Sequence, residues 1–192
     1  MLKMLKMLKK IKSFLILMVC FFCLNCYAFS SDSIYNLNSE LTDKNGIVNN
    51  LGDLSGKVQV FSMIYTNCKT ICPIIVANMK SIEKLVPKNV LDDVQFSLIS
   101  LDPDRDSVPT LSKFFKEKKL NSKYWNLFKT TKDDTLKISL AVGVKYKKEK
   151  NNEYTHSNLI IILDKNGVIK MHHQGLDKNY SNVIKLISSL SK

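Results

Sequence analysis

Four stretches of the chain carry the apolar patterns that are typical of β-strands. Lys57–Tyr65 is rich in apolar residues, and Val94–Leu101 alternates its large side chains between two faces. Leu159–Leu163 is an uninterrupted apolar run, and Asp164–Gly167 separates it from Val168–Met171 with the residues of a tight turn. These patterns predict two buried strands and a β-hairpin.

Helical periodicity alternates with these strands. Pro73 suits the first position of a helix, four apolar residues follow at spacings of four, three and four, and Pro87 ends the pattern. Three further helices are predicted by caps or by an apolar face. Their signals are Ser107 with Pro109, Thr131 with Asp134 and Gly143, and the series Val183, Ile184, Ile187 and Leu190.

The order of these elements predicts the class of fold. A polar segment, Ser30–Leu54, contains the turn residues Asp43–Gly46 between two short candidate strands. The remaining order is β-α-β-α-α-β-β-α, which predicts an α/β fold with a mixed central sheet and helices on both faces. Functional sites in such sheets lie beyond the carboxyl ends of the strands.

Residues 1–28 carry the pattern of an export signal. Five lysines in the first twelve positions precede an apolar run of eleven residues, Phe14–Leu24. As a helix this run is about 16 Å long, whereas the membrane core is about 30 Å thick. Small residues in Cys26–Ala28 predict cleavage before Phe29, and the alternative is an uncleaved membrane anchor. In both cases we expect a single folded domain, residues 29–192, outside the cytoplasm.

The net charge of +12 does not indicate nucleic-acid binding. Only Arg105 among the 29 basic residues is an arginine, the residue best suited to base readout and bidentate phosphate contacts. Five lysines belong to the predicted leader, and the others are interspersed with acidic residues. We therefore expect no nucleic-acid partner.

Cys68 and Cys72 are the two cysteines of the predicted exported domain, because the other three lie in the leader. Cys72 directly precedes Pro73, so we expect Cys72 to cap the helix that follows. The positive end of that helix would lower the pKa of the Cys72 thiol and favour the thiolate, which is both nucleophile and metal ligand. The spacing suits a redox-active disulfide or a two-sulfur chelate. A purely structural disulfide is the alternative.

Histidines offer a third candidate ligand. His156 lies shortly before the apolar run that starts at Leu159, where a surface histidine is an equally open interpretation. Two thiolates with one imidazole would suit copper in either oxidation state, whereas zinc would require a fourth ligand. His172 and His173 are consecutive on a predicted strand and point to opposite faces, so both cannot join one site. We expect both of them at the surface.

Three motifs together resemble the Sco/SenC family. They are Tyr65–Pro73 (YTNCKTICP), Ser100–Asp106 (SLDPDRD) and Thr155–Ser157 (THS), and the resemblance extends from about Tyr35 to Leu190. It implies a thioredoxin-like fold and a site where two cysteines and one histidine bind copper. The residues that match these ligands are Cys68, Cys72 and His156, and those that match the acidic loop near the site, in a supporting role, are Asp102 and Arg105.

The resemblance also implies a function. Family members are usually tethered to a membrane, and they help to metallate the binuclear copper centre of cytochrome c oxidase or reduce the thiols that hold it. For this chain it implies a copper metallochaperone with thiol–disulfide redox activity that binds one copper ion, Cu(I) or Cu(II). The expected partner is the copper-receiving subunit of cytochrome c oxidase or another copper protein. The expected location is the periplasm, with or without an anchor in the inner membrane, and we expect a monomer.

Two features depart from the family pattern. Lys69 stands where many members have proline, which adds positive charge beside the thiolates. The leader is also shorter than a full transmembrane helix. The alternative function is an exported thioredoxin-like thiol–disulfide oxidoreductase or thiol peroxidase without copper delivery, so enzymatic activity stays open. Against it, thioredoxins usually have two residues between their cysteines, and no proline precedes Leu159. A binding module with a structural disulfide is a third interpretation.

Overall fold

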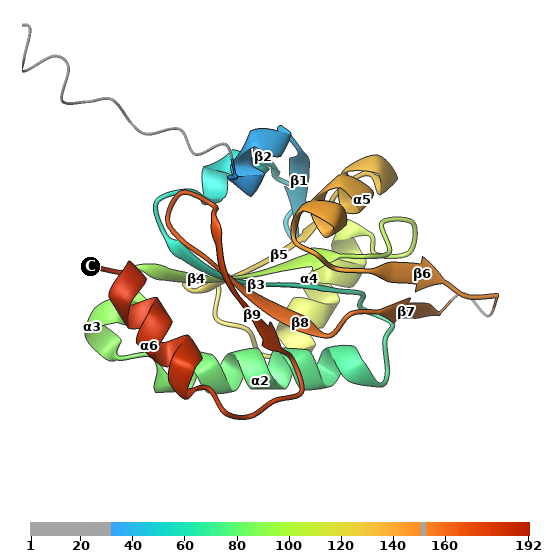
Figure 1. The fold of residues 1–192 in the computed structure, drawn as a ribbon. Helices are drawn as coiled ribbons and strands as arrows, with labels where there is room; N and C mark the ends of the chain where they lie inside the picture. The colour runs from blue at the N-terminus through green and yellow to red at the C-terminus, as the bar shows by residue number, and fades with distance from the viewer. Residues whose placement is uncertain (1–31, 151–152) are drawn as a thin grey trace, which may run out of the picture. The chain divides into compact units, whose positions relative to one another are not determined.

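A seven-stranded mixed sheet lies at the centre of the computed structural model, which describes residues 32–150 and 153–192 (Figure 1). The predicted leader, residues 1–28, lies outside the described residues. The strands are β1 (Glu40–Asp43), β2 (Val48–Asn50), β3 (Val58–Ile64), β4 (Val94–Ser100), β5 (Trp125–Lys129), β6 (Tyr146–Lys148), β7 (Tyr154–His156), β8 (Leu159–Leu163) and β9 (Ile169–Gln174). The order across the sheet is β2-β1-β5-β4-β3-β8-β9, and β6 pairs with β7 in a separate hairpin.

The centre of the sheet is parallel and fully buried. β3 pairs in parallel with β4, and β4 with β5, whereas β8 and β9 continue the sheet antiparallel to β3. Every residue of β3 and β4 is buried, which requires cover on both faces of the sheet. The strands predicted from the apolar runs are thereby confirmed, as is the hairpin between β8 and β9.

Helices supply this cover from two sides. They are η1 (Ile34–Leu37), η2 (Leu51–Leu54), α2 (Ile71–Leu85), α3 (Lys88–Leu91), α4 (Val108–Glu117), α5 (Lys132–Ala141) and α6 (Ser181–Leu190). Figure 1 shows α2 and α6 along one side of the sheet and α5 along the other. The predicted α/β fold, with a mixed sheet and helices on both faces, is confirmed. Within the described residues, no helix combines the length and the apolar character needed to cross a membrane.

The predicted helix signals are also confirmed in detail. Ser107 Oγ accepts the backbone N–H of Thr110 at 3.4 Å, and Thr131 Oγ1 accepts the N–H of Asp134 at 3.1 Å. Gly143 follows α5 with a φ of +73°, the left-handed conformation that ends many helices. The apolar residues predicted to form the inner face of this helix are all buried, namely Ile75, Met79 and Ile82 in α2 and Val86 directly after it.

The start of α2 differs from the prediction. The helix begins at Ile71 with Thr70 as its N-cap, so Cys72 lies inside the first turn instead of capping it. Pro73 is compatible with this earlier start, because the first N–H groups of a helix have no acceptor within the helix. The proline therefore marks the first turn of the helix without fixing its first residue.

Three strands of the structure are not predicted, because their sequences lack the apolar pattern of a strand. In β5, buried Trp125 stacks on Phe96 of β4 with ring centroids 5.0 Å apart, but the strand has only five residues and two of them are half-buried. β6 and β7 have three residues each, and β6 reads Tyr-Lys-Lys. Segments this short and polar show no period, so the predicted order lacks all three.

Candidate metal centre

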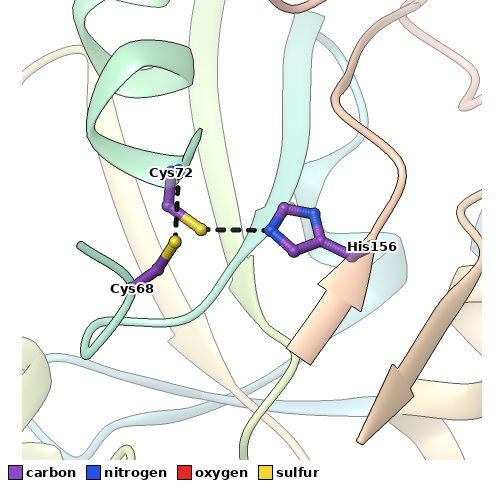
Figure 2. A group of neighbouring side chains, drawn as sticks. All are labelled: Cys68, Cys72 and His156. Carbon is purple, nitrogen blue, oxygen red and sulfur yellow. Dashed lines mark hydrogen bonds between the residues drawn. The ribbon is translucent and has the colours of Figure 1, made fainter. Parts of the chain in front are cut away.

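Three separate elements bring Cys68, Cys72 and His156 together (Figure 2). Cys68 lies in the loop that follows β3, Cys72 in the first turn of α2, and His156 at the end of β7. One ligand atom from each residue lies within 4.8 Å of the other two. This is the carboxyl end of a parallel strand, where the rule for such sheets places a site. The structure therefore groups all three residues that the sequence indicates as ligands.

Two contacts define the geometry of the group. The Sγ of Cys72 lies 3.3 Å from the Nε2 of His156, and the backbone N–H of Cys72 points at the Sγ of Cys68 from 3.4 Å. Cys68 and Cys72 are buried, with 7% and 0% of their surface exposed, and His156 is half-buried. Both cysteines are free thiols in this structure. The group thus has two sulfur atoms inside and one imidazole toward the surface.

The pKa values of the two thiols are shifted in opposite directions. Burial raises the pKa of Cys68, but hydrogen bonds from the backbone of Cys72 and Thr70 and from nearby side chains outweigh it and lower that pKa to about 6. The pKa of Cys72 is raised, first by burial and then by the neighbouring Cys68. The prediction that the helix terminus favours a Cys72 thiolate is therefore wrong. Because α2 starts before Cys72, the N–H of Cys72 points at the sulfur of Cys68 instead.

His156 presents the nitrogen that a metal would require. Its Nδ1 lies 2.8 Å from the backbone carbonyl oxygen of Ser157, which makes Nδ1 the protonated nitrogen. The Nε2 then carries the lone pair and faces the sulfur of Cys72. A fixed tautomer of this kind is typical of histidines that bind metals.

Asp102 and Arg105 lie outside the Cys-Cys-His group. Asp102 is fully buried and is paired with the guanidinium of Arg105. It also accepts a hydrogen bond from the hydroxyl of Tyr154 at 3.3 Å. The guanidinium of Arg105 lies 5.9 Å from the ring centroids of both Tyr65 and Tyr154. Both residues thus contact aromatic side chains next to the site, and their supporting role remains a prediction.

Asp106 is a site residue that the sequence interpretation leaves without a role. Its buried carboxylate accepts hydrogen bonds from the backbone N–H of Thr66 at 3.1 Å, from the Thr66 hydroxyl at 2.5 Å and from the Ser100 hydroxyl at 2.5 Å. These bonds hold the loop that carries Cys68. The only signal in the sequence is that both motifs follow strands, and strand order is needed to see that the loops meet.

The remaining histidines lie elsewhere. His172 is exposed, as expected, and its Nε2 lies 3.0 Å from the carbonyl oxygen of Val142. The expectation that His173 is at the surface is wrong, because it is buried against Tyr180 and its Nε2 lies 3.0 Å from the carbonyl oxygen of Asp177. The two side chains point to opposite faces of β9, and neither belongs to the Cys-Cys-His group.

Sequence and structure comparisons relate the chain to one family. A model of the family described as SCO1/SenC matches residues 31–191. A SCO1 protein homolog of Bacillus subtilis (strain 168) is 25% identical over 146 residues, which are 73% of this chain and 75% of that protein. The crystal structure of a SCO1/SenC family lipoprotein from Bacillus anthracis str. Ames is similar with 29% identity and a TM-score of 0.73, over 81% of this chain and 97% of that one.

A third similar structure is that of a protein with copper bound. Arabidopsis thaliana ScoI with copper bound has a TM-score of 0.69 at 20% identity, over 79% of this chain and 96% of that one. At this identity the likeness supports the fold alone, and it confirms the predicted thioredoxin-like architecture.

Proposed function

Because the chain belongs to the SCO1/SenC family, we propose that it is an exported copper metallochaperone whose ligands are Cys68, Cys72 and His156. The observation that carries this proposal is the convergence of their three ligand atoms within 4.8 Å. The copper ion is the cargo of the protein, held by one domain until a receiving protein takes it.

The donor set fits copper better than zinc. Thiolates suit Cu(I), and the imidazole of His156 adds the nitrogen that Cu(II) prefers. A structural zinc site is usually closed by four protein ligands, and the described residues supply three to this group. Of the three residues His156 is the one that is only half-buried, so a partner would approach the metal from the side of the imidazole.

Metal loading and release would involve the proton of Cys72. Cys68, with its lowered pKa, offers a thiolate directly, whereas the raised pKa of Cys72 keeps that thiol protonated. Binding copper through both sulfurs therefore displaces a proton from Cys72, since a metal-bound thiol is deprotonated. The Nε2 of His156 faces the sulfur of Cys72 before loading and can bind the metal.

The partner and the location follow from the family and the leader. We propose the copper-receiving subunit of cytochrome c oxidase, or another copper protein, as the recipient, and a monomer as the active form. The motifs support this, since they match a family associated with that centre. For the location, we propose that residues 1–28 export residues 29–192 to the periplasm or anchor them at the inner membrane. The B. anthracis relative, described as a lipoprotein, supports a membrane-associated setting.

The experiment that tests this function is a copper titration of the reduced protein. We expect one Cu(I) per chain in the wild type and loss of tight binding in Cys68→Ser and in Cys72→Ser, because each variant retains one sulfur and one nitrogen. His172→Ala is the matched control and should bind as the wild type does. A wild type that binds no copper, or that retains zinc in competition with Cu(I), would contradict the proposal.

The lowered pKa of Cys68 and the raised pKa of Cys72 support a second candidate function, thiol–disulfide exchange. The Cys68 thiolate would attack a disulfide of a partner and form a mixed disulfide, with one partner thiolate as the leaving group. Cys72, once deprotonated, would then attack Cys68, releasing the second partner thiol and leaving a Cys68–Cys72 disulfide. The partner disulfide is reduced and the Cys68–Cys72 pair is oxidised. Reduction of a disulfide peptide by the copper-free protein, lost in Cys68→Ser, would establish this activity.

A further inference from the structure

The hairpin that carries His156 is not part of the main sheet. β6 and β7 pair only with each other, in the register Tyr146 opposite His156. A two-stranded hairpin on its own is marginally stable in water. His156 lies three residues before β8, so the chain keeps it near the sheet, and side-chain contacts between the hairpin and the body of the domain can then fix its orientation toward the cysteines.

Tyr65 makes such contacts with three residues of the hairpin segment. Its hydroxyl donates to the Oε2 of Glu153 at 2.7 Å and accepts the backbone N–H of Tyr154 at 3.4 Å. Its ring lies 5.3 Å from the ring of Tyr154 and meets the ring of His156 edge-on, at 6.0 Å between centroids and an interplanar angle of 80°. Both the polar and the aromatic parts of Tyr65 thus face the segment that ends in His156.

Side chains of β7 point alternately to its two faces, which explains why Tyr65 can contact both Tyr154 and His156. Tyr154 and His156 are two positions apart on a strand, so their side chains point to the same face. That face is turned toward Tyr65, which is buried and directly follows β3. Three residues farther on, the backbone N–H of Cys68 donates to the carbonyl oxygen of Tyr65 at 3.2 Å. Tyr65 therefore connects the loop that bears Cys68 with the strand that bears His156.

We propose that Tyr65 is a positioning residue that fixes the β6–β7 hairpin and thereby holds the Nε2 of His156 at the sulfur of Cys72. The inference rests on the proposed copper function for its metal readout, but its structural part is independent of copper. The side chain of Tyr65 acts on the third ligand through the hairpin. Its hydroxyl also lies beside the thiol of Cys68, but the N–H of Cys68 bonds to the backbone carbonyl of Tyr65, which a side-chain substitution retains. Loss of Tyr65 should weaken the binding of Cu(II), which needs the imidazole. It should leave the binding of Cu(I) unchanged, because two sulfurs can hold that ion.

The test compares Tyr65→Phe with Tyr124→Phe in the full-length chain. Both substitutions remove a tyrosine hydroxyl that donates to a carboxylate, but Tyr124 bonds to Asp92, away from the site. The first readout needs no copper: amide hydrogen exchange of residues 146–148 and 154–156. The second is binding of Cu(II) and of Cu(I), measured separately, together with the absorption of the thiolate–Cu(II) complex.

We expect faster exchange of the hairpin in Tyr65→Phe and a loss of Cu(II) affinity of about tenfold, the low end for partners that orient a metal ligand. Cu(I) affinity should be unchanged, and Tyr124→Phe should behave as the wild type. Glu153→Ala, which removes the acceptor and leaves the Tyr65 ring, should give the same direction of change and replaces Tyr65→Phe if that variant fails to fold.

The outcomes separate this inference from the proposed function. A wild type without copper binding contradicts the function, while hydrogen exchange still decides the role of Tyr65. Unchanged hairpin exchange and unchanged Cu(II) binding in Tyr65→Phe would overturn the positioning role. An equal loss of Cu(I) and Cu(II) would also overturn it, since Tyr65 would then act through the Cys68 loop.

Discussion

Asp106 and Thr66 are forty residues apart in the sequence, yet the carboxylate of Asp106 accepts hydrogen bonds from both the N–H and the hydroxyl of Thr66. The parallel pairing of β3 with β4 brings their loops together, since Ile64 lies opposite Ser100 at the carboxyl ends of the two strands. The aspartate-rich motif thus holds the cysteine-bearing loop in place. This contact explains physically why two motifs so far apart belong to one site.

Asp106→Ala should destabilise the domain by about 2 kcal/mol, because it leaves the N–H of Thr66 and two hydroxyl groups without their buried acceptor. Urea unfolding measures the change. Asp104→Ala is the matched control, since Asp104 lies in the same loop but its ion pair with Lys132 is exposed and should contribute little. Equal stability of the two variants would contradict the role assigned to Asp106.

The stability contributed by Asp106 should depend on pH. Burial, and then the charge of Asp102, raise the pKa of Asp106 above its ordinary value of 3.8, against the hydrogen bonds from Ser100 and Thr66. A raised pKa means that the folded state binds the proton more tightly than the unfolded state. This proton-linked part of the stability, which is separate from the hydrogen bonds that the side chain accepts, is therefore fully present below the unfolded pKa and is lost as pH rises through the folded pKa.

Unfolding of the wild type and of Asp106→Asn, measured across a pH series that starts below 3.8, checks this sign. The free energy of unfolding of the wild type minus that of the variant should decrease as pH rises. A difference that increases with pH would show that the hydrogen bonds outweigh burial and lower the pKa of Asp106.

The sequence alone indicates the three residues that the structure groups and most of the buried strands of the central sheet, but not β5. Cys68, Cys72 and His156 belong to motifs with fixed spacing, and the buried strands β3, β4 and β8 are long apolar runs. The acidity of the two thiols could not be predicted, because it depends on where α2 begins. A start before Cys72 instead of at Pro73 directs the N–H of Cys72 to the sulfur of Cys68.

The surroundings of His156 could not be predicted either. β6 and β7 are too short and polar to show a strand pattern, so the histidine reads as a loop residue in the sequence. Its contact with Tyr65 joins positions far apart along the chain and needs the three-dimensional path of the hairpin. Local patterns determine which residues are available, whereas tertiary packing determines how they are oriented.

In the reduced protein, Cys68 should react with iodoacetamide at far lower pH than Cys72. The pKa of Cys68 is lowered to about 6, so its thiolate predominates at neutral pH, whereas the pKa of Cys72 is raised. Short labelling pulses followed by peptide mass spectrometry should show, of these two cysteines, alkylation of Cys68 and not of Cys72 at neutral pH. The denatured protein is the control and should label at both cysteines. Preferential labelling of Cys72 would reverse the assignment of the two thiols.

His156→Ala should separate the two oxidation states of copper. Without the imidazole, Cys68 and Cys72 can still hold Cu(I) in a two-coordinate arrangement, because thiolates are the soft ligands that Cu(I) prefers. Cu(II) prefers nitrogen and more ligands, so its binding should be lost together with the thiolate–Cu(II) absorption band. His172→Ala, which removes an exposed imidazole outside the group, should retain both states. If His156→Ala binds Cu(II) as the wild type does, then His156 is not the third ligand, and the contact between its Nε2 and the sulfur of Cys72 has another purpose.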